Sequence, residues 1–401
     1  MHSSLFRTAL VLGLLSVIGP FSIDMYLPAM PQIGTELGAP ETQVQLTISL
    51  YFLAFGVSQF IWGPMADAYG RKLPLILGIS LFMLGSVGCA LAPSIEWLIA
   101  ARFIQGVGGA AVGVVPRAVV RDRYTGIEAT RLMALIMLVI SIGPMLAPLI
   151  GSLLLQFGSW RLVFGALLLV ATMSLLVTLF ALPETLAREH RRPVNFRTMG
   201  QGLRRLFGSA SFMGLTMVGA FGFGSFFVFI ASAAFVYTNT FALTPTQFSL
   251  AFALNALGFF AASQAAAPLG QRVGLRRSMS WALVGFATSA LALLGLTLAG
   301  FGTLPIIMGF LFVGNACLGL VMPATFVMAL EEQGDIAGLA SSLGGTLQMV
   351  TGSVLVSLTA PFFDGTPLPM VATIAFCAVM ALVIGLAVLN RVPRRASAAA
   401  E

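Results

Sequence analysis

The sequence predicts an all-α membrane protein with twelve transmembrane helices arranged as two six-helix bundles. Of its 401 residues, 58% are hydrophobic and only 9% are charged, whereas a soluble globular chain carries roughly 25% charged residues. A core of this composition could not be covered by a polar shell, so a soluble domain is excluded. The hydrophobic residues suffice for about ten to twelve helices of the roughly 20 residues that cross a bilayer.

Twelve apolar runs are long enough to cross a bilayer, and each is expected to form a helix. The first run follows Arg7, as the apolar part of a signal peptide would. It contains Asp24 and lacks a small-residue cleavage site, so we expect it to remain as the first span. The expected spans are 8–34, 42–66, 73–92, 95–120, 128–155, 160–182, 209–238, 245–268, 276–299, 303–330, 337–360 and 369–391.

The longest polar interval divides these spans six and six. We expect an N-terminal bundle over 1–186, a cytoplasmic linker over 187–208 and a C-terminal bundle over 209–401. A partial repeat supports the division, because 64–72 follows the second span and 268–276 follows the eighth. Both segments keep a proline, a glycine and a final basic residue. Two six-helix repeats with a site between them are typical of transporters.

The basic residues indicate the orientation. If the spans alternate, almost all of them lie on the side of the termini, and only Arg161 lies on the other side. The positive-inside rule then places both termini in the cytoplasm, and we expect a bacterial cytoplasmic (inner) membrane. The net charge of +7 therefore reports orientation, and no nucleic-acid partner is expected. The residues on the terminal side are Arg7, Arg71, Lys72, Arg117, Arg121, Arg123, Arg131, Arg188, Arg191, Arg192, Arg197, Arg204, Arg205, Arg272, Arg276, Arg277, Arg391, Arg394 and Arg395.

Asp24 and Arg102 are the charged groups expected inside apolar spans. A charged carboxylate at membrane depth is costly, so Asp24 can alternate between neutral and charged forms, as proton coupling requires. The alternative is a water-facing residue at a helix bend. Arg102 lies about 10 Å inward from the outer end of its span. It either extends to the membrane surface or lines the cavity, where a conditional ion pair with Asp24 is geometrically plausible. Gln105 follows one turn later on the same face.

Two glycine-containing segments are candidates for gating. In 63–72, Gly63 and Gly70 permit a tight turn between helices, while Asp67 can cap a helix end and pair with a base such as Arg71. The alternative is that the charged residues of this segment are simply solvated in a loop. In the fifth span, two prolines close together can kink the helix, and small residues let neighbours approach. Structural kinking alone would also explain this segment, in which the candidates are Gly143, Pro144 and Gly151.

Polar residues buried in the spans are candidates for the substrate cavity, although hydrogen bonding between helices would equally explain them. No catalytic residue or metal site is expected, because the three cysteines are isolated and both histidines lie in terminal or loop positions. The 32 phenylalanines suit a lipid-facing surface or a tolerant apolar cavity. The cavity candidates are Tyr26, Tyr51, Gln105, Asn255 and Gln348.

Several of these motifs resemble those of the major facilitator superfamily over essentially the whole chain. The segment 63–72 is similar to the family's loop 2–3 signature, and 102–106 to its span-four signature. The segment 143–151 resembles the antiporter signature that is found mainly in exporters. Asp24-Met25-Tyr26-Leu27-Pro28 and 117–122 resemble the bicyclomycin and chloramphenicol resistance branch of drug:proton antiporters.

The resemblance implies roles for individual residues. Asp24 would be the proton-linked carboxylate and Arg102 the coupling arginine, while Asp67, Gly70 and Arg71 would serve the inner gate. The chain departs from the pattern at Ala68, where the family commonly has arginine, and at Ser152, where a second glycine is usual. The first departure removes one arginine from the cytoplasmic charge network that the resemblance implies.

The sequence therefore predicts a proton-driven exporter of small, mostly apolar or cationic drugs. We expect a monomer in the lipid bilayer that uses the proton as coupling ion and needs no other cofactor. A sugar or metabolite exporter on the same scaffold is the alternative. An enzyme would need clustered catalytic residues at depth, and a channel would need no coupling carboxylate between the repeats.

Overall fold

The computed structural model describes residues 2–124, 126–191, 196–331 and 333–391. Within these residues the chain is helical, without a strand, and twelve helices are long and apolar enough to cross a membrane. The predicted all-α membrane fold is therefore confirmed. Three arginines that entered the orientation argument, Arg192, Arg394 and Arg395, lie outside the described residues.

The first span, expected as one helix over 8–34 with a bend at Asp24 as the alternative, contains a break directly after Asp24. Its α-helix ends at Asp24, a short 3-10 turn η1 follows, and a second helix completes the span. Proline disfavours helical geometry in the residue before it, and Pro28 and Pro31 fall in this region. The bounds in the first half are α1 His2–Asp24, η1 Leu27–Ala29, α2 Met30–Leu37, α3 Glu41–Tyr69, α4 Lys72–Ala90, α5 Ile95–Arg123, α6 Gly126–Gln156, α7 Arg161–Phe180 and η2 Arg188–His190.

The second half contains two elements that were not expected. The helix α8 lies in the interval predicted as a linker, and a π-helical turn, η3, extends the end of α9. Thr244 and Gln247 form a reciprocal capping box that starts α10. The bounds are α8 Phe196–Gly208, α9 Ala210–Phe235, η3 Val236–Thr240, α10 Pro245–Val273, α11 Leu275–Leu298, α12 Leu304–Leu330, η4 Gly334–Ile336, α13 Ala337–Thr359, η5 Ala360–Phe362 and α14 Leu368–Arg391.

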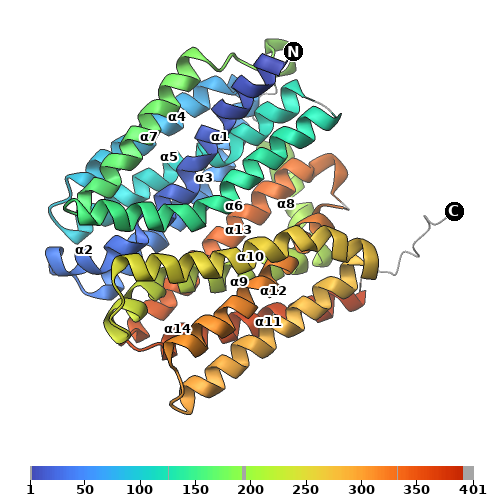
Figure 1. Ribbon diagram of the computed structural model, residues 1–401. Helices are drawn as coiled ribbons and strands as arrows, with labels where there is room; N and C mark the ends of the chain where they lie inside the picture. Colours follow the sequence, from blue (N-terminus) through green and yellow to red (C-terminus); the bar gives the residue numbers. More distant parts are fainter. Residues whose placement is uncertain (1, 125, 192–195, 332, 392–401) are drawn as a thin grey trace.

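The long helices pack mainly with helices from their own half of the chain (Figure 1). In the first half, α5 packs on α3 and α4, and α1 packs on α6. In the second half, α12 packs on α10 and α11, while α9 packs on α13 and α14. The halves meet chiefly where α3 contacts α13 and where α6 contacts α10. Any pathway between the halves is therefore bordered by these helices.

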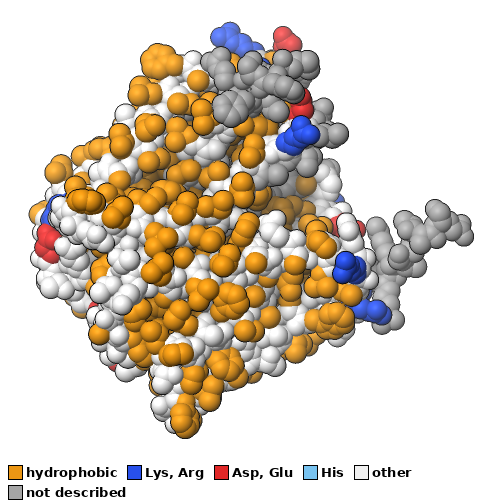
Figure 2. All heavy atoms as spheres, in the orientation of Figure 1, with side chains coloured by type: hydrophobic (Ala, Val, Ile, Leu, Met, Phe, Trp, Pro, Cys, Tyr) orange, Lys and Arg blue, Asp and Glu red, His pale blue; other side chains and the backbone are white. Residues whose placement is uncertain are grey.

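Charged side chains gather at two ends of the molecule, and the surface between them is largely hydrophobic (Figure 2). This distribution matches a protein whose middle is surrounded by lipid. We call the end with the turns at 70–71 and 274 the basic face. The end with the loops 38–40, 91–94 and 157–160 is called the opposite face.

The partial sequence repeat is also a conformational repeat. Gly70 connects α3 to α4 with a φ of 93°, and Gly274 connects α10 to α11 with a φ of 88°. Such left-handed values are accessible to glycine at little cost. The same kind of turn therefore lies on the basic face of each half.

Candidate functional site

Asp24 is buried at the break in the first span. It is the last residue of α1 and only 3% exposed. The amide of Met25 still donates to the carbonyl of Phe21 at 3.1 Å, so helical bonding ends immediately beyond Asp24. Within the described part of the chain, no donor hydrogen bonds to its carboxylate and no cation pairs with it. Burying a charged carboxylate in such surroundings is costly, which favours the neutral form.

Arg102 is completely buried in α5 and lies between two tyrosine rings. Its guanidinium carbon is 4.7 Å from the ring centroid of Tyr26 and 4.3 Å from that of Tyr51. Its Nη1 donates to the carbonyl of Ser22 at 3.0 Å and to Oε1 of Gln105 at 2.5 Å. Nε and Nη2 have no hydrogen-bond partner among the described residues. The cation is thus held by ring faces and neutral oxygens, while Nε and Nη2 have no acceptor among the described residues.

A shell of hydroxyl groups holds this arrangement in place. Gln105 donates to Oγ of Ser86 at 2.8 Å. The hydroxyls of Ser22 and Tyr51 share a hydrogen bond of 2.6 Å, and those of Tyr26 and Thr47 share one of 2.8 Å. The residues around Arg102 therefore come from α1, α3, α4 and α5 and are fixed by their own bonds.

The structure distinguishes between the two sequence interpretations of Arg102. The side chain does not extend to the membrane surface, because it is 0% exposed. The ion pair with Asp24 that we considered is not formed in this conformation, since Arg102 binds neutral oxygens instead. Arg102 nevertheless binds α1 two residues before Asp24, because its acceptor there is the carbonyl of Ser22.

The glycines predicted for gating in α6 lie against the broken first span. A Cβ on Gly143 would lie 2.6 Å from Cβ of Pro20, and one on Gly151 would overlap the carbonyl oxygen of Met25. Pro144 and Pro148 are both accommodated inside α6. The small residues therefore let α6 pack closely on α1 on both sides of Asp24.

The five cavity candidates separate into two groups. Tyr26, Tyr51 and Gln105 meet around Arg102 and are fully buried. Asn255 lies in the second half, where it donates to the carbonyl of Ala251 at 3.1 Å.

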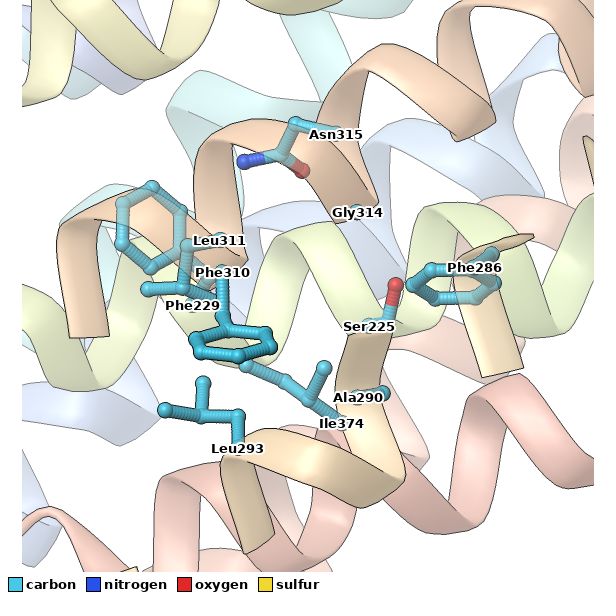
Figure 3. A pocket seen from close by; sticks show the side chains of 10 residues that line it. All are labelled: Ser225, Phe229, Phe286, Ala290, Leu293, Phe310, Leu311, Gly314, Asn315 and Ile374. Carbon is cyan, nitrogen blue, oxygen red and sulfur yellow. The ribbon is translucent and has the colours of Figure 1, made fainter. Parts of the chain in front are cut away.

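Gln348, the other candidate in the second half, lies on α13 and lines a cavity of about 20 Å³ that is bordered by α9 and α12. Another cavity of about 10 Å³ lies near Asn315, whose amide stands among aromatic rings (Figure 3). Asn315 also donates to Asn255 at 3.4 Å. Each cavity has room for about one water molecule, so neither holds a drug in this conformation.

A charge cluster on the basic face centres on Arg71, whose side chain is 8% exposed. Its Nε and Nη2 donate to the two carboxylate oxygens of Asp122 at 2.7 and 3.1 Å, and Nη1 donates to Asp67 at 2.5 Å. The turn is shorter than the sequence predicts, because α3 continues through Tyr69. Gly63 is therefore helical, and a Cβ there would make only ordinary contact with Val114.

Glu184 completes this cluster. Its carboxylate accepts from the backbone amides of Arg71 at 2.8 Å, Lys72 at 3.2 Å, Thr185 at 2.9 Å and Leu186 at 3.0 Å. Burial opposes ionisation, but the four amides dominate and lower the pKa of Glu184 below the usual value of a glutamate. A Cβ on Gly70 would overlap this carboxylate, which adds a second reason for glycine at the turn.

Asp122 and Glu184 were not among the predicted site residues. Asp122 appeared only within the branch-specific segment, and its spacing from Arg71 gave no indication of contact. Glu184 follows Pro183 in a polar interval that carries many other charges. Only the fold brings these residues to the turn after α3.

Comparisons with known proteins agree with this architecture. The family model described as Major Facilitator Superfamily matches residues 12–352. The chain belongs to this superfamily. It is 34% identical over 374 residues to an uncharacterized MFS-type transporter, YdgK, of Bacillus subtilis (strain 168), covering 93% of this chain and 92% of the relative. It is 29% identical over 382 residues to a bicyclomycin resistance protein homolog of Haemophilus influenzae, covering 95% of this chain and 96% of the relative.

A solved structure supports the same fold. The crystal structure of a D-xylose-proton symporter aligns with a TM-score of 0.76 at 15% identity, covering 97% of this chain and 98% of that chain. The family predicted from the motifs is confirmed, and so is the prediction that the chain is a transporter rather than an enzyme. The chain is a multi-pass membrane protein of the Major Facilitator Superfamily.

In this superfamily member, the halves meet in the middle of the molecule and toward the opposite face. Ser249 on α10 donates to the carbonyl of Pro148 at 2.8 Å, and Thr346 on α13 donates to that of Gly56 at 2.7 Å. The rings of Phe52 and Phe227 stack with centroids 4.0 Å apart. The boundary between the halves, which we call the seam, is therefore closed in the middle of the molecule and toward the opposite face by both polar and aromatic contacts.

Proposed function

We propose that this chain is a proton-driven exporter of small, mostly apolar or cationic drugs that works by alternating access. The carboxylate of Asp24, buried at a break in the first span and without a partner among the described residues, is the observation that carries this proposal. A group of this kind binds and releases a proton at a defined depth in the membrane. The similarity to a bicyclomycin resistance protein homolog supports drug export.

Arg102 supplies the second half of the coupling mechanism. While Asp24 is neutral, Arg102 remains on Ser22 and Gln105, as it does in this conformation. When Asp24 loses its proton, the unused Nε and Nη2 groups give the new carboxylate a charged donor within the same buried region. Deprotonation therefore rearranges a network that ties α1 to α5.

The transport cycle follows from this exchange. With the basic face open, a drug enters and Asp24 releases its proton to the cytoplasm. With the opposite face open, a proton from outside neutralises Asp24 and the drug leaves. A membrane potential of 100 mV supplies about 2.3 kcal/mol for each net charge moved. This energy sustains a concentration ratio of about 50 for one-to-one electrogenic exchange.

Aromatic side chains support an apolar substrate class. Phe226 on α9 and Phe259 on α10 stack with centroids 6.2 Å apart, and both are only half-buried. Flat apolar rings accept many shapes and also attract cations. In the membrane, the basic face and both termini lie on the cytoplasmic side of a bacterial cell.

Uptake into inverted membrane vesicles tests the assignment of Asp24. Wild-type vesicles should accumulate chloramphenicol or tetraphenylphosphonium when an acidic interior is imposed, and Asp24→Asn should abolish the accumulation. Glu36→Gln is the matched control, because Glu36 is a carboxylate on the opposite face that pairs with Arg161 within the same half. Accumulation driven by the pH gradient in Asp24→Asn would refute the assignment.

A compound panel tests the substrate class. Expression in an efflux-deficient bacterium should raise resistance to some apolar or cationic drugs. If no drug is resisted and sugars or other metabolites are exported instead, the alternative function applies.

A further inference from the structure

A hydrogen bond to a carboxylate joins the two halves at the opposite face. Glu41 is the first residue of α3, and Asn239 lies in η3 at the end of α9. Nδ2 of Asn239 donates to Oε1 of Glu41 at 2.5 Å. We call this contact, Glu41 with Asn239, the latch.

The backbone beside the latch is strained. Asn239 belongs to the π-helical turn η3, a rare geometry that often marks functional segments. Ala242, three residues later, has a φ of 53° and is the only non-glycine residue with positive φ in the described chain. Such a conformation is unfavourable for alanine and persists only where surrounding contacts impose it. Thr240, which donates to the carbonyl of Gly365 at 2.6 Å, supplies one such contact.

Two buried polar groups near the latch lack partners within the described residues. Nε2 of Gln45 and the hydroxyl of Tyr237 are both without a hydrogen bond, and the residues are 1% and 0% exposed. Gln45 is one turn from Glu41 on the face of α3 that continues to Ser49. Ser49 donates to the carbonyl of Ser353 at 2.8 Å, so this face forms the seam with α13. Opening the seam would let water reach the unpartnered group of Gln45.

The other titratable groups around this region already have partners or carry no charge. Glu36 on α2 pairs with Arg161. Asp364, before α14, accepts from the amide and hydroxyl of Thr366. Tyr237 in η3 is neutral near physiological pH. Glu96, in the exposed first turn of α5, which also packs on α3, hydrogen-bonds with the Ser94 side chain. The described segments of α9, α13 and η5 that pack on this end of α3 carry no charged side chain.

We propose that the latch is released by acid: protonation of Glu41 from the opposite face weakens its bond to Asn239, and the strained segment 236–242 then relaxes as the seam opens. A hydrogen bond to an ionised acceptor is about twice as strong as a neutral one. The inference rests on the proposed function in one respect, since a proton-driven exporter meets the more acidic compartment on this face. Protons from that compartment then both open the seam at the opposite face and neutralise Asp24.

Accessibility of a cysteine in the seam tests the latch without any transport. Ser353 is 3% exposed, so Ser353→Cys, in a chain whose native cysteines are replaced by alanine, reports opening. In nanodiscs, its labelling by a charged maleimide, corrected for thiolate reactivity with a free-thiol standard, should rise about fivefold from about pH 8 to about pH 5. Glu41→Gln should label fast at both pH values, and Glu36→Gln should behave like the parent. A Glu41→Gln chain that keeps the parent's pH dependence would overturn the latch.

Asn239→Asp gives a test in the opposite direction. Two carboxylates at the latch repel each other when both are charged but can share one proton, so this variant should open at high pH and close on acidification. If its pH dependence keeps the parent's sign, the latch is wrong. Hydrogen exchange of the amides in 236–243 in the unmodified chain and in Glu41→Gln provides the same comparison without introduced cysteines.

The latch and the proposed function can fail separately. Acid-dependent labelling that disappears in Glu41→Gln supports the latch even if Asp24→Asn still exports drugs. If the pH dependence of labelling is unchanged in Glu41→Gln, the latch is refuted even if export depends on Asp24.

Discussion

Gly151→Ala is expected to disturb the first span at the position of Asp24. The added Cβ would overlap the carbonyl oxygen of Met25, the residue that follows Asp24 at the helix break. Backbone atoms at a close helix contact cannot move aside as a flexible side chain would. Forcing an extra methyl group into such a contact costs about 1–3 kcal/mol. The separation of α6 from α1 would also displace the carboxylate.

Gly165→Ala on α7 is the matched control for this substitution. A Cβ at Gly165 meets nothing within 4 Å, and alanine in a helix interior is favoured over glycine by about 0.5–1 kcal/mol. Gly151 also lies inside a helix and gains the same preference, so the two variants should differ by the cost of the close contact, about 1–3 kcal/mol in stability. Thermal unfolding of purified protein measures the difference, and vesicle uptake should fall only for Gly151→Ala. Equal midpoints and equal uptake would refute the proposed close contact.

Three further outcomes follow from the charge cluster on the basic face and from Arg102. Asp122→Asn should destabilise the protein by about 3 kcal/mol because it breaks a bidentate pair with the largely buried Arg71. Asp67→Asn should cost at most about 1 kcal/mol because the Asp67 side chain is 60% exposed, and the reverse ranking in thermal unfolding would contradict the geometry. The lowered pKa of Glu184 implies a stabilisation that is present above the unfolded value of 4.5 and is lost as the pH falls through the folded value. The difference in midpoint between wild type and Glu184→Gln should therefore be largest near neutral pH and vanish in acid, and a constant difference would contradict it. Arg102→Lys should impair proton-coupled uptake by tenfold or more, since an ammonium cannot reproduce the planar fork between two rings, whereas wild-type rates would exclude the role assigned to the guanidinium.

The spans and the family could be predicted because they depend on composition and short motifs. Twelve apolar runs need only hydropathy, and the segments around Asp24, Arg102 and Gly143 carry recognisable residue patterns. Gln105 was placed beside Arg102 by helical periodicity, and the structure gives a hydrogen bond between them. Local spacing was sufficient in these cases.

Contacts between distant segments could not be predicted in the same way. Glu184 and Asp122 reach Arg71 only through the packing of three separate helix ends. The helix α8 was missed because its alternation of arginine and apolar residues is too polar for a span. The break after Asp24 lies against Gly151 of α6, and the π-helical turn is hydrogen-bonded to α3 and to the loop before α14, so both involve contacts with distant segments.

Proton release on drug binding tests the central claim most directly. Purified protein at neutral pH, mixed with a transported drug in weakly buffered solution, should release about one proton for each drug molecule bound. Asp24→Asn should bind the drug and release none, while Glu36→Gln should match the wild type. Undiminished proton release from Asp24→Asn would show that another group carries the coupling proton.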